Sequence, residues 1–281
     1  IGMSSKFISQ LDKVLLQFFT NSEHVGYYTA GFRFGSMVKM IGVVMGGILM
    51  PDFSKSFARN DPFAVSRKIY RFERFSYIFI LPLILVVSIL SDVIVIVLLG
   101  EDFQSSVKIM RIITIAMFLY IMGTPFGSVI TGSGRFNLAA VIHGIRLAIF
   151  GIFVVLLVHP DFYDLKGLGM AIVFLVINLL TFILYRLYAR KFCSSINNLF
   201  AVPYVLLAIG MLAGGYFFYI SYCTDIWSKI LFLVVFILIY LLTEYLLHLL
   251  NKDDFKELKK LASFRDMSNY VKNELNDGKK E

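Results

Sequence analysis

The stretch VGYYTAGFRFGSMVKMIGVVMGGILMP, residues 25–51, is long enough to cross a lipid bilayer, yet it carries two cations inside its apolar run. With a rise of 1.5 Å per residue, Arg33 lies about 12 Å from the outer end and Lys39 about 21 Å. A cation near the bilayer centre costs about 2.5–3.5 kcal/mol even on insertion scales, so such residues usually face a bundle interior or a wet cavity. The stretch therefore predicts a membrane helix whose cations point inward.

The rest of the chain extends this prediction to an integral membrane protein. Of its 281 residues, 58% are hydrophobic and 16% are charged. A soluble domain of this size cannot bury that much apolar surface, because its exterior must be largely polar. Apolar runs of about 20 residues, the length that spans a bilayer, predict helices at 4–20, 25–50, 75–99, 107–131, 137–158, 168–188, 203–223 and 227–250. The expected fold class is an all-α polytopic bundle of about eight transmembrane helices.

The charges of the connecting segments predict how the bundle is oriented. The chain has a formal net charge of +8, which the positive-inside rule explains better than binding to nucleic acid does. Basic segments alternate with acidic ones along the chain: 51–74, 132–135, 186–192 and the tail are basic, whereas 100–103 and 159–167 are acidic. We therefore expect a multi-pass protein of the cytoplasmic membrane with a cytoplasmic C-terminus.

The sequence indicates three regions. Residues 1–191 would form a lobe of six transmembrane segments, residues 192–250 two additional transmembrane helices, and residues 251–281 a charged cytoplasmic tail. The tail has the spacing of an amphipathic helix, which could lie on the inner leaflet or be a solvated, partly frayed helix. The chain starts without Met or a signal-peptide pattern, so we expect a part of a longer protein.

Deep charged side chains are the candidate functional residues. Lys13, Arg33, Lys39 and Arg146 are expected at depth, and Asp12 is the carboxylate at a comparable depth. A cavity with this balance would attract an anion. Two interpretations stay open: each cation is held in an internal salt bridge, for which Asp12 is available, or the cations line a hydrated anion site. In a straight helix Arg33 and Lys39 point about 120° apart, so they would not hold one phosphate side by side.

Two further features concern packing and bending. Gly31, Gly35, Gly42 and Gly46 fall within about 60° of one another on a helix, a small-residue stripe that permits close approach of another helix. This stripe could serve plain packing or let helices slide. Pro125, within IMGTPFGSVITG, predicts a kink, which in transporters often borders a substrate path.

The remaining polar residues give no sign of catalysis. Lys108 and Arg111 are expected to extend to the outer interface, and His143, one turn before Arg146, is expected to be a packing residue. The sequence lacks a phosphate-binding loop, a nucleophile elbow and a zinc-binding pattern. We therefore expect no enzyme, no cofactor and no metal.

Several motifs resemble those of bacterial lipid-linked oligosaccharide flippases. They are VGYYTAGFRF (25–34), ILMPDFSKSFARND (48–61), TPFGSVITGSGRFNLAAVI (124–142) and LKGLGMAI (165–172). Together they resemble the O-antigen and polysaccharide flippases of the multidrug, oligosaccharidyl-lipid and polysaccharide exporter superfamily. The likeness covers residues 4–190 and implies that the chain corresponds to the C-terminal lobe and two added helices, with the N-terminal lobe of the same fold as a missing partner.

The resemblance implies translocation of an isoprenoid-pyrophosphate-linked oligosaccharide of the undecaprenyl type by alternating access. Arg33 would match an arginine of the family's eighth helix and, with Lys39, would pair with the lipid's phosphates. Arg146 or Lys13 would supplement them, and Asp12 would form an ion pair or take part in cation coupling. The implied partners are membrane lipids and the lipid-linked oligosaccharide, not nucleic acid. The alternatives are a multidrug-type cation-coupled exporter and a membrane enzyme of glycan assembly.

Overall fold

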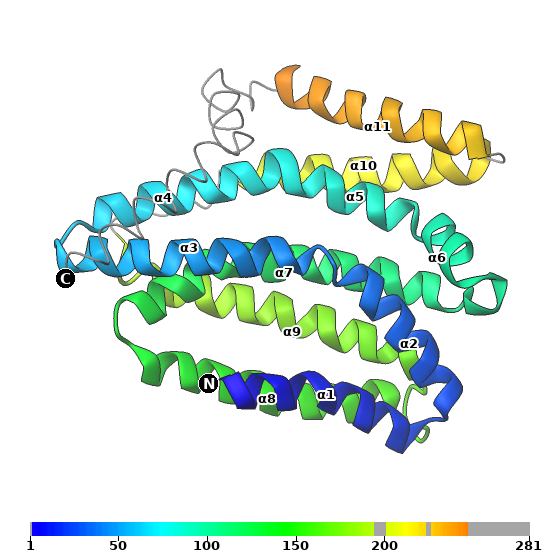
Figure 1. The fold of residues 1–281 in the computed structure, drawn as a ribbon, viewed down its shortest axis with the longest axis horizontal. Helices are drawn as coiled ribbons and strands as arrows, with labels where there is room; N and C mark the ends of the chain where they lie inside the picture. Colours follow the sequence, from blue (N-terminus) through cyan, green and yellow to red (C-terminus); the bar gives the residue numbers. More distant parts are fainter. Residues whose placement is uncertain (1, 194–200, 223–225, 247–281) are drawn as a thin grey trace, which may run out of the picture. The chain divides into compact units, whose positions relative to one another are not determined.

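The computed structural model describes residues 2–193, 201–222 and 226–246, and helices make up nearly all of them (Figure 1). In chain order these are α1 (Gly2–Phe19), α2 (Ser22–Gly35), α3 (Lys39–Ala58), α4 (Pro62–Phe75), a π-helical turn (Ser76–Ile80), α5 (Leu81–Ile89), α6 (Ser91–Leu99), a 3₁₀ turn (Glu101–Phe103), α7 (Ser106–Gly132), α8 (Phe136–Val158), α9 (Lys166–Ala189), α10 (Ala201–Tyr222) and α11 (Ile226–Leu246). The described residues include no strand. The predicted all-α class is confirmed.

Within the described residues, five helices are long and apolar enough to cross a membrane. They are Pro62–Ile89, Ser105–Gly132, Phe136–Val158, Lys166–Ala189 and Val202–Tyr219. A sixth span results if α2 and α3, which meet at an angle of 51°, cross together. The protein is therefore a multi-pass membrane protein, with a number of spans that roughly fits the predicted bundle.

The helix predicted at 25–50 is bent. Between α2 and α3 the backbone winds more tightly, with bonds from the Lys39 amide to the Ser36 carbonyl (2.9 Å) and from the Met40 amide to the Met37 carbonyl (3.2 Å). Bonds to the third preceding residue are typical of 3₁₀ winding, which often marks a hinge within a helix. Gly35 and Ser36 stand at the start of the bend. Gly/Ser pairs are a common place for helix kinks, a signal that apolar run length does not reveal.

The segment 51–74, predicted as a cytoplasmic loop, is a helical hairpin instead. Helix α3 continues to Ala58, and α4 starts at Pro62 after Asp61, whose side chain accepts the Ala64 amide at 2.9 Å. Val65, Ile69 and Phe72 share the buried face of α4. The basic residues occupy the rest of the helix. Because they are so many, the helical spacing of the apolar residues between them is easily overlooked in the sequence.

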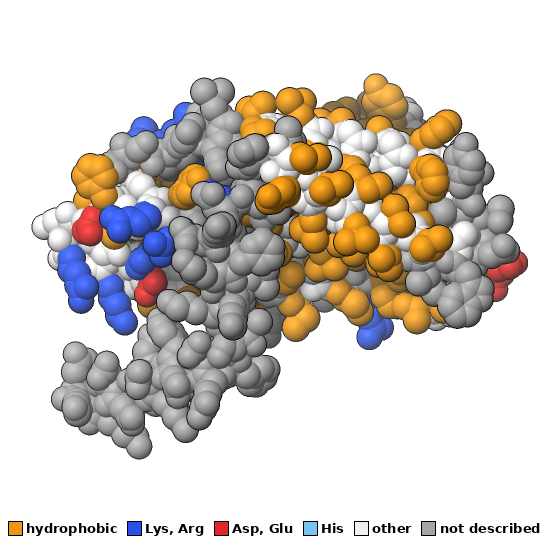
Figure 2. Space-filling model, turned by 90° about the horizontal axis from the view of Figure 1, so that it is seen from above, with side chains coloured by type: hydrophobic (Ala, Val, Ile, Leu, Met, Phe, Trp, Pro, Cys, Tyr) orange, Lys and Arg blue, Asp and Glu red, His pale blue; other side chains and the backbone are white. Residues whose placement is uncertain are grey.

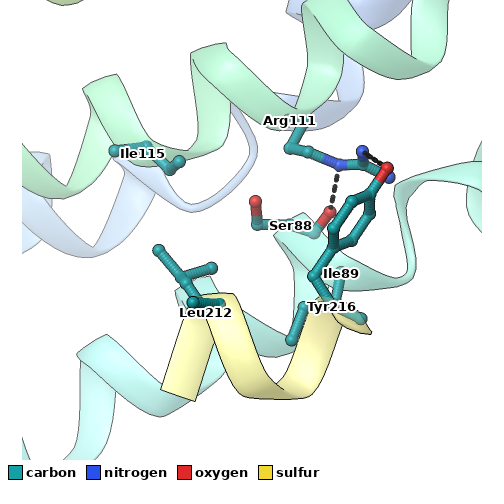
Figure 3. A pocket seen from close by; sticks show the side chains of 7 residues that line it. Ser88, Ile89, Arg111, Ile115, Leu212 and Tyr216 are labelled. Atoms are coloured by element: carbon teal, nitrogen blue, oxygen red, sulfur yellow. Dashed lines mark hydrogen bonds between the residues drawn. The ribbon is translucent and has the colours of Figure 1, made fainter. Parts of the chain in front are cut away.

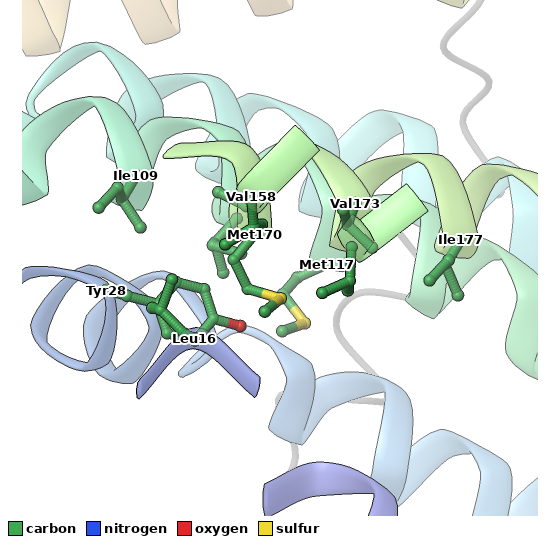
Figure 4. Close-up of a cluster of buried hydrophobic side chains, with 11 residues drawn as sticks. Leu16, Tyr28, Ile109, Met117, Val158, Met170, Val173 and Ile177 are labelled. Atoms are coloured by element: carbon green, nitrogen blue, oxygen red, sulfur yellow. The ribbon is translucent and has the colours of Figure 1, made fainter. Parts of the chain in front are cut away.

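Helix α7 is the centre of the bundle and packs against α2, α3, α5 and α9. One core cluster joins Leu16 of α1 and Tyr28 of α2 to Ile109 and Met117 of α7 and to Met170 at the start of α9 (Figure 4). These side chains are buried. Their packing holds α1 and α2 against α7 and α9.

The surface agrees with a protein that is embedded in lipid. Many large hydrophobic side chains are exposed, among them Val97 (69%), Leu206 (65%) and Phe217 (71%). Figure 2 shows hydrophobic side chains spread over one face, whereas Lys and Arg gather at the end where α3 and α4 meet. Such separation is expected when a hydrocarbon layer covers the apolar band.

The three predicted regions stay a prediction. Residues 1–233 form one compact unit, and the described residues beyond it, Val234–Leu246, complete α11. The predicted tail at 251–281 lies outside the described residues.

Candidate functional site

Lys39 and Arg146 come together from distant parts of the sequence. Lys39 is the first residue of α3 and Arg146 lies within α8. Both are partly buried, and their positive charges are close enough to act on each other. In the part of the chain that the structure describes, neither forms an ion pair with a carboxylate. The interpretation that an internal salt bridge holds Lys39 and Arg146 is therefore not supported within the described residues.

Two tyrosines and a histidine surround this pair. The Lys39 ammonium lies over the Tyr120 ring, 5.0 Å from its centroid. The Tyr185 hydroxyl is 3.3 Å from Nε2 of His143, and the Arg146 guanidinium is close enough to interact with both tyrosines. We call Lys39, Tyr120, His143, Arg146 and Tyr185 the cationic cluster. It is built by α3, α7, α8 and α9.

A glycine of α7 positions one of the tyrosines. A Cβ atom added at Gly127 would lie 3.1 Å from Cε2 of Tyr185, closer than nearly all real contacts of that kind. The absence of a side chain at this position lets the Tyr185 ring rest against α7 while its hydroxyl reaches His143. The cluster therefore depends on close packing between α7 and α9.

The chemistry of the cluster suits an anion with several oxygens. The Lys39 ammonium offers three donors and the Arg146 guanidinium a planar set of five. Arg binds phosphate in a bidentate manner, whereas Lys acts as a compact point charge. Tyrosine hydroxyls can donate further hydrogen bonds. Partial burial strengthens such interactions because screening by water is weaker there.

Arg33 and Lys13 make no described contact with the cationic cluster. Arg33 is exposed on α2, before the bend, and its carbonyl accepts the Ser36 hydroxyl at 3.2 Å. Lys13 is half-buried on α1, where its charge acts on Asp12. Arg33 and Lys39 lie on opposite sides of the 51° bend between α2 and α3.

Asp12 is a buried carboxylate whose side chain joins two helices. It is 5% exposed, and it accepts the Tyr28 hydroxyl at 2.8 Å and the backbone amide of Lys13 at 2.9 Å. Tyr28 itself is fully buried on α2. Within the described residues Asp12 makes no ion pair with Arg33 or Lys39, so a hydrogen bond takes the place of the predicted salt bridge.

The glycine stripe faces α7 along its whole length. A Cβ added at Gly31 or Gly35 would lie 2.9 Å from Cγ2 of Ile109 or 3.0 Å from Cγ2 of Ile113, respectively. At Gly42 and Gly46 the corresponding distances are 3.1 Å to Cγ1 of Ile121 and 2.9 Å to Cγ2 of Thr124. All four positions therefore require the absence of a side chain for α2 and α3 to approach α7.

Helix α7 runs without a break through Pro125, which is buried within it. A bend of 51° lies at residues 36–38, between α2 and α3, directly before Lys39.

Sequence reasoning missed a buried ion pair between α4 and α9. The Glu73 carboxylate accepts a hydrogen bond from the Arg186 guanidinium, and only 4% and 12% of the two side chains are exposed. The guanidinium also lies 5.1 Å from the Phe126 ring and 5.7 Å from the Phe182 ring. Both charges were assigned to cytoplasmic loops. The position of Glu73, next to Phe72 and one turn after Ile69, was the available signal of a buried face.

Comparison with known proteins gives one match. Residues 1–108 match a family described as "polysaccharide biosynthesis protein". This stretch runs from α1 to the start of α7 and includes Asp12, Arg33 and Lys39 but not Arg146. No curated protein and no solved structure matches. The match is consistent with a polysaccharide flippase-like family, as the motifs predicted, and supports a role in polysaccharide biosynthesis or export.

Proposed function

We propose that this chain forms one lobe of a flippase that moves an isoprenoid-pyrophosphate-linked oligosaccharide across the cytoplasmic membrane. The observation that carries the proposal is that Lys39 and Arg146, two partly buried cations whose charges act on each other, have no carboxylate partner among the described residues. Like charges repel when they are brought together in a poorly screened environment. A bound pyrophosphate would remove that cost.

In the proposed transport cycle the cationic cluster is the binding site for the head group. The phosphates pair with Lys39 and Arg146 while the isoprenoid tail stays in lipid. A second lobe of the same fold would complete the cavity, and rocking of the two lobes would expose it to each side in turn. No covalent bond is made or broken, so the chain acts as a transporter and not as an enzyme. Membrane lipids and the lipid-linked oligosaccharide are its partners, with no role for nucleic acid.

The basic end of the molecule supports an orientation. The α3–α4 hairpin carries the concentration of Lys and Arg seen in Figure 2, and such segments stay in the cytoplasm. With this end in the cytoplasm, the protein would lie in the inner membrane with a cytoplasmic C-terminus. Residues Glu101 and Asp102, between α6 and α7, would face outward.

The cluster's charge argues against a multidrug-type exporter. Such a protein would need carboxylates to hold cationic drugs, whereas Lys39 and Arg146 present positive charge. An enzyme of glycan assembly would normally have a sizeable outer loop with clustered polar residues. The turn from Gly100 to Ser105 is short, which favours transport.

Genetic complementation tests the proposal. We expect Lys39→Ala and Arg146→Ala, each in the full-length protein, to abolish rescue of a flippase-deficient strain. Lys39→Arg should restore part of the activity because it keeps the charge. The control is Arg190→Gln, an exposed cation just after α9, which should rescue like wild type. Membrane levels of all variants are measured by immunoblotting. Full rescue by both alanine variants would refute the anion site, and equal loss in Arg190→Gln would show that the assay does not report on it.

A further inference from the structure

A cavity outside the cationic cluster lies where α5, α7 and α10 meet (Figure 3). Its volume is about 250 Å³, and its walls are almost entirely apolar, formed by side chains such as Ile89, Ile115 and Leu212. One charged residue, Arg111 of α7, also lines it. A cavity with apolar walls and a single cation is unusual for a site that holds only water, which needs several polar partners.

Arg111 is held in place but retains unused donors. Its Nε donates to the Ser88 carbonyl at 3.0 Å, and a terminal nitrogen donates to the Tyr216 hydroxyl at 2.9 Å. The guanidinium lies 4.6 Å from the centroid of the Tyr216 ring. A guanidinium has five N–H donors, so these two bonds leave others available to an anion. In Figure 3 the side chain reaches from α7 toward α5 and α10.

The Ser88 hydroxyl is the second sign of a ligand. Ser88 is 1% exposed and lines the cavity, yet its Oγ has no hydrogen-bond partner. A buried polar atom without a partner costs about 1–3 kcal/mol. A ligand oxygen placed between this hydroxyl and Arg111 would satisfy both groups.

The polar and apolar parts of the site are ordered along α7. Arg111 lies about 7.5 Å along the axis from Ser106, and Lys108, one turn before it, is exposed and makes no ion pair in the described structure. Ile115 lies one turn further into the bundle. The cations therefore lie near the end of the span and the apolar walls lie deeper. A lipid has the same order, with its head group at the membrane surface and its chains in the interior.

We propose that this cavity binds an anionic phospholipid from the leaflet at that end of α7. The phosphate accepts hydrogen bonds from Arg111 and the Ser88 hydroxyl, and a chain covers the apolar walls. A zwitterionic head group would bring its ammonium toward Arg111 and Lys108, so an anionic one is favoured. A phospholipid is the source because the bilayer presents its phosphate at this depth. The site does not involve the cationic cluster.

Native mass spectrometry of the purified full-length protein tests the proposal, with lipid adducts counted after addition of phosphatidylglycerol, phosphatidylcholine, isoprenyl phosphate or inorganic phosphate. We expect phosphatidylglycerol to bind best and Ala213→Phe, which fills the cavity, to weaken it about tenfold. Gly214→Phe is the matched control, because a Cβ at Gly214 meets nothing within 4 Å. Arg111→Gln should reduce the preference for phosphatidylglycerol over phosphatidylcholine.

Three results would overturn the proposal. Unchanged phosphatidylglycerol binding in both Ala213→Phe and Arg111→Gln would show that lipid binds elsewhere. Isoprenyl phosphate binding that exceeds phosphatidylglycerol binding and is lost in Ala213→Phe would assign the cavity to a different lipid, because binding at the cationic cluster would survive that substitution. Inorganic phosphate that binds as well as phosphatidylglycerol would show that the apolar walls do not contribute to binding. Thermal unfolding of Ala213→Phe and Gly214→Phe is compared, so that lipid binding is measured on folded protein in both variants.

Discussion

The hydrogen bond from the Tyr28 hydroxyl to Asp12 satisfies a carboxylate that has little access to water. Tyr28→Phe removes this donor from the buried carboxylate. We expect the free energy of unfolding in detergent to fall by about 1–3 kcal/mol. The matched control is Tyr27→Phe, whose hydroxyl donates to Glu23 in an exposed pair at 2.7 Å and should change stability far less. Equal effects of the two variants would contradict this account.

The Glu73–Arg186 pair makes a different prediction, because both side chains are charged and largely buried. Glu73→Gln leaves the guanidinium without its carboxylate and should cost about 3–5 kcal/mol. The control is Asp52→Asn, which breaks the partly exposed bond to Lys68 (3.1 Å) and should cost about 0–1 kcal/mol. Chemical unfolding in mixed micelles measures both. A smaller loss for Glu73→Gln than for Asp52→Asn would contradict the buried pair.

At the scale of elements, two adjacent glycines of α3 test how closely that helix approaches α7. A Cβ at Gly46 would lie 2.9 Å from Thr124, whereas a Cβ at Gly47 meets nothing within 4 Å. We expect Gly46→Leu to lower the melting temperature and the yield of folded protein, because the Thr124 methyl group leaves no room for a side chain at this close approach of two helices. Gly47→Leu should behave like wild type. The two proteins are compared by size-exclusion chromatography and thermal unfolding, and similar profiles would mean that α3 is not held against α7.

Some elements could be predicted from the sequence and others could not, for physical reasons. Apolar run length is enough to find α7, α8 and α9, since a span needs about 20 predominantly apolar residues. It fails for α4, which is amphipathic, and for the bend at residues 36–38, which arises from tighter backbone winding. The meeting of Lys39 with Arg146 depends on how α3 and α8 are placed around the bundle. Helix periodicity within one element cannot supply that information.

At the scale of the whole molecule, the alternation of basic and acidic turns predicts which ends face the cytoplasm. We expect a membrane-impermeant maleimide added to intact cells to label Glu101→Cys but not Arg59→Cys, in a protein whose Cys193 and Cys223 are replaced by Ser. The reverse labelling pattern would overturn the proposed orientation.

The central claim is that Lys39 and Arg146 together bind the phosphates of the transported lipid. Equilibrium binding of an isoprenyl pyrophosphate to the purified full-length protein tests this claim most directly. We expect Lys39→Ala and Arg146→Ala each to weaken this binding about tenfold or more, a loss of about 1.4 kcal/mol. Arg190→Gln should leave the affinity unchanged. Wild-type affinity in both alanine variants would contradict the account.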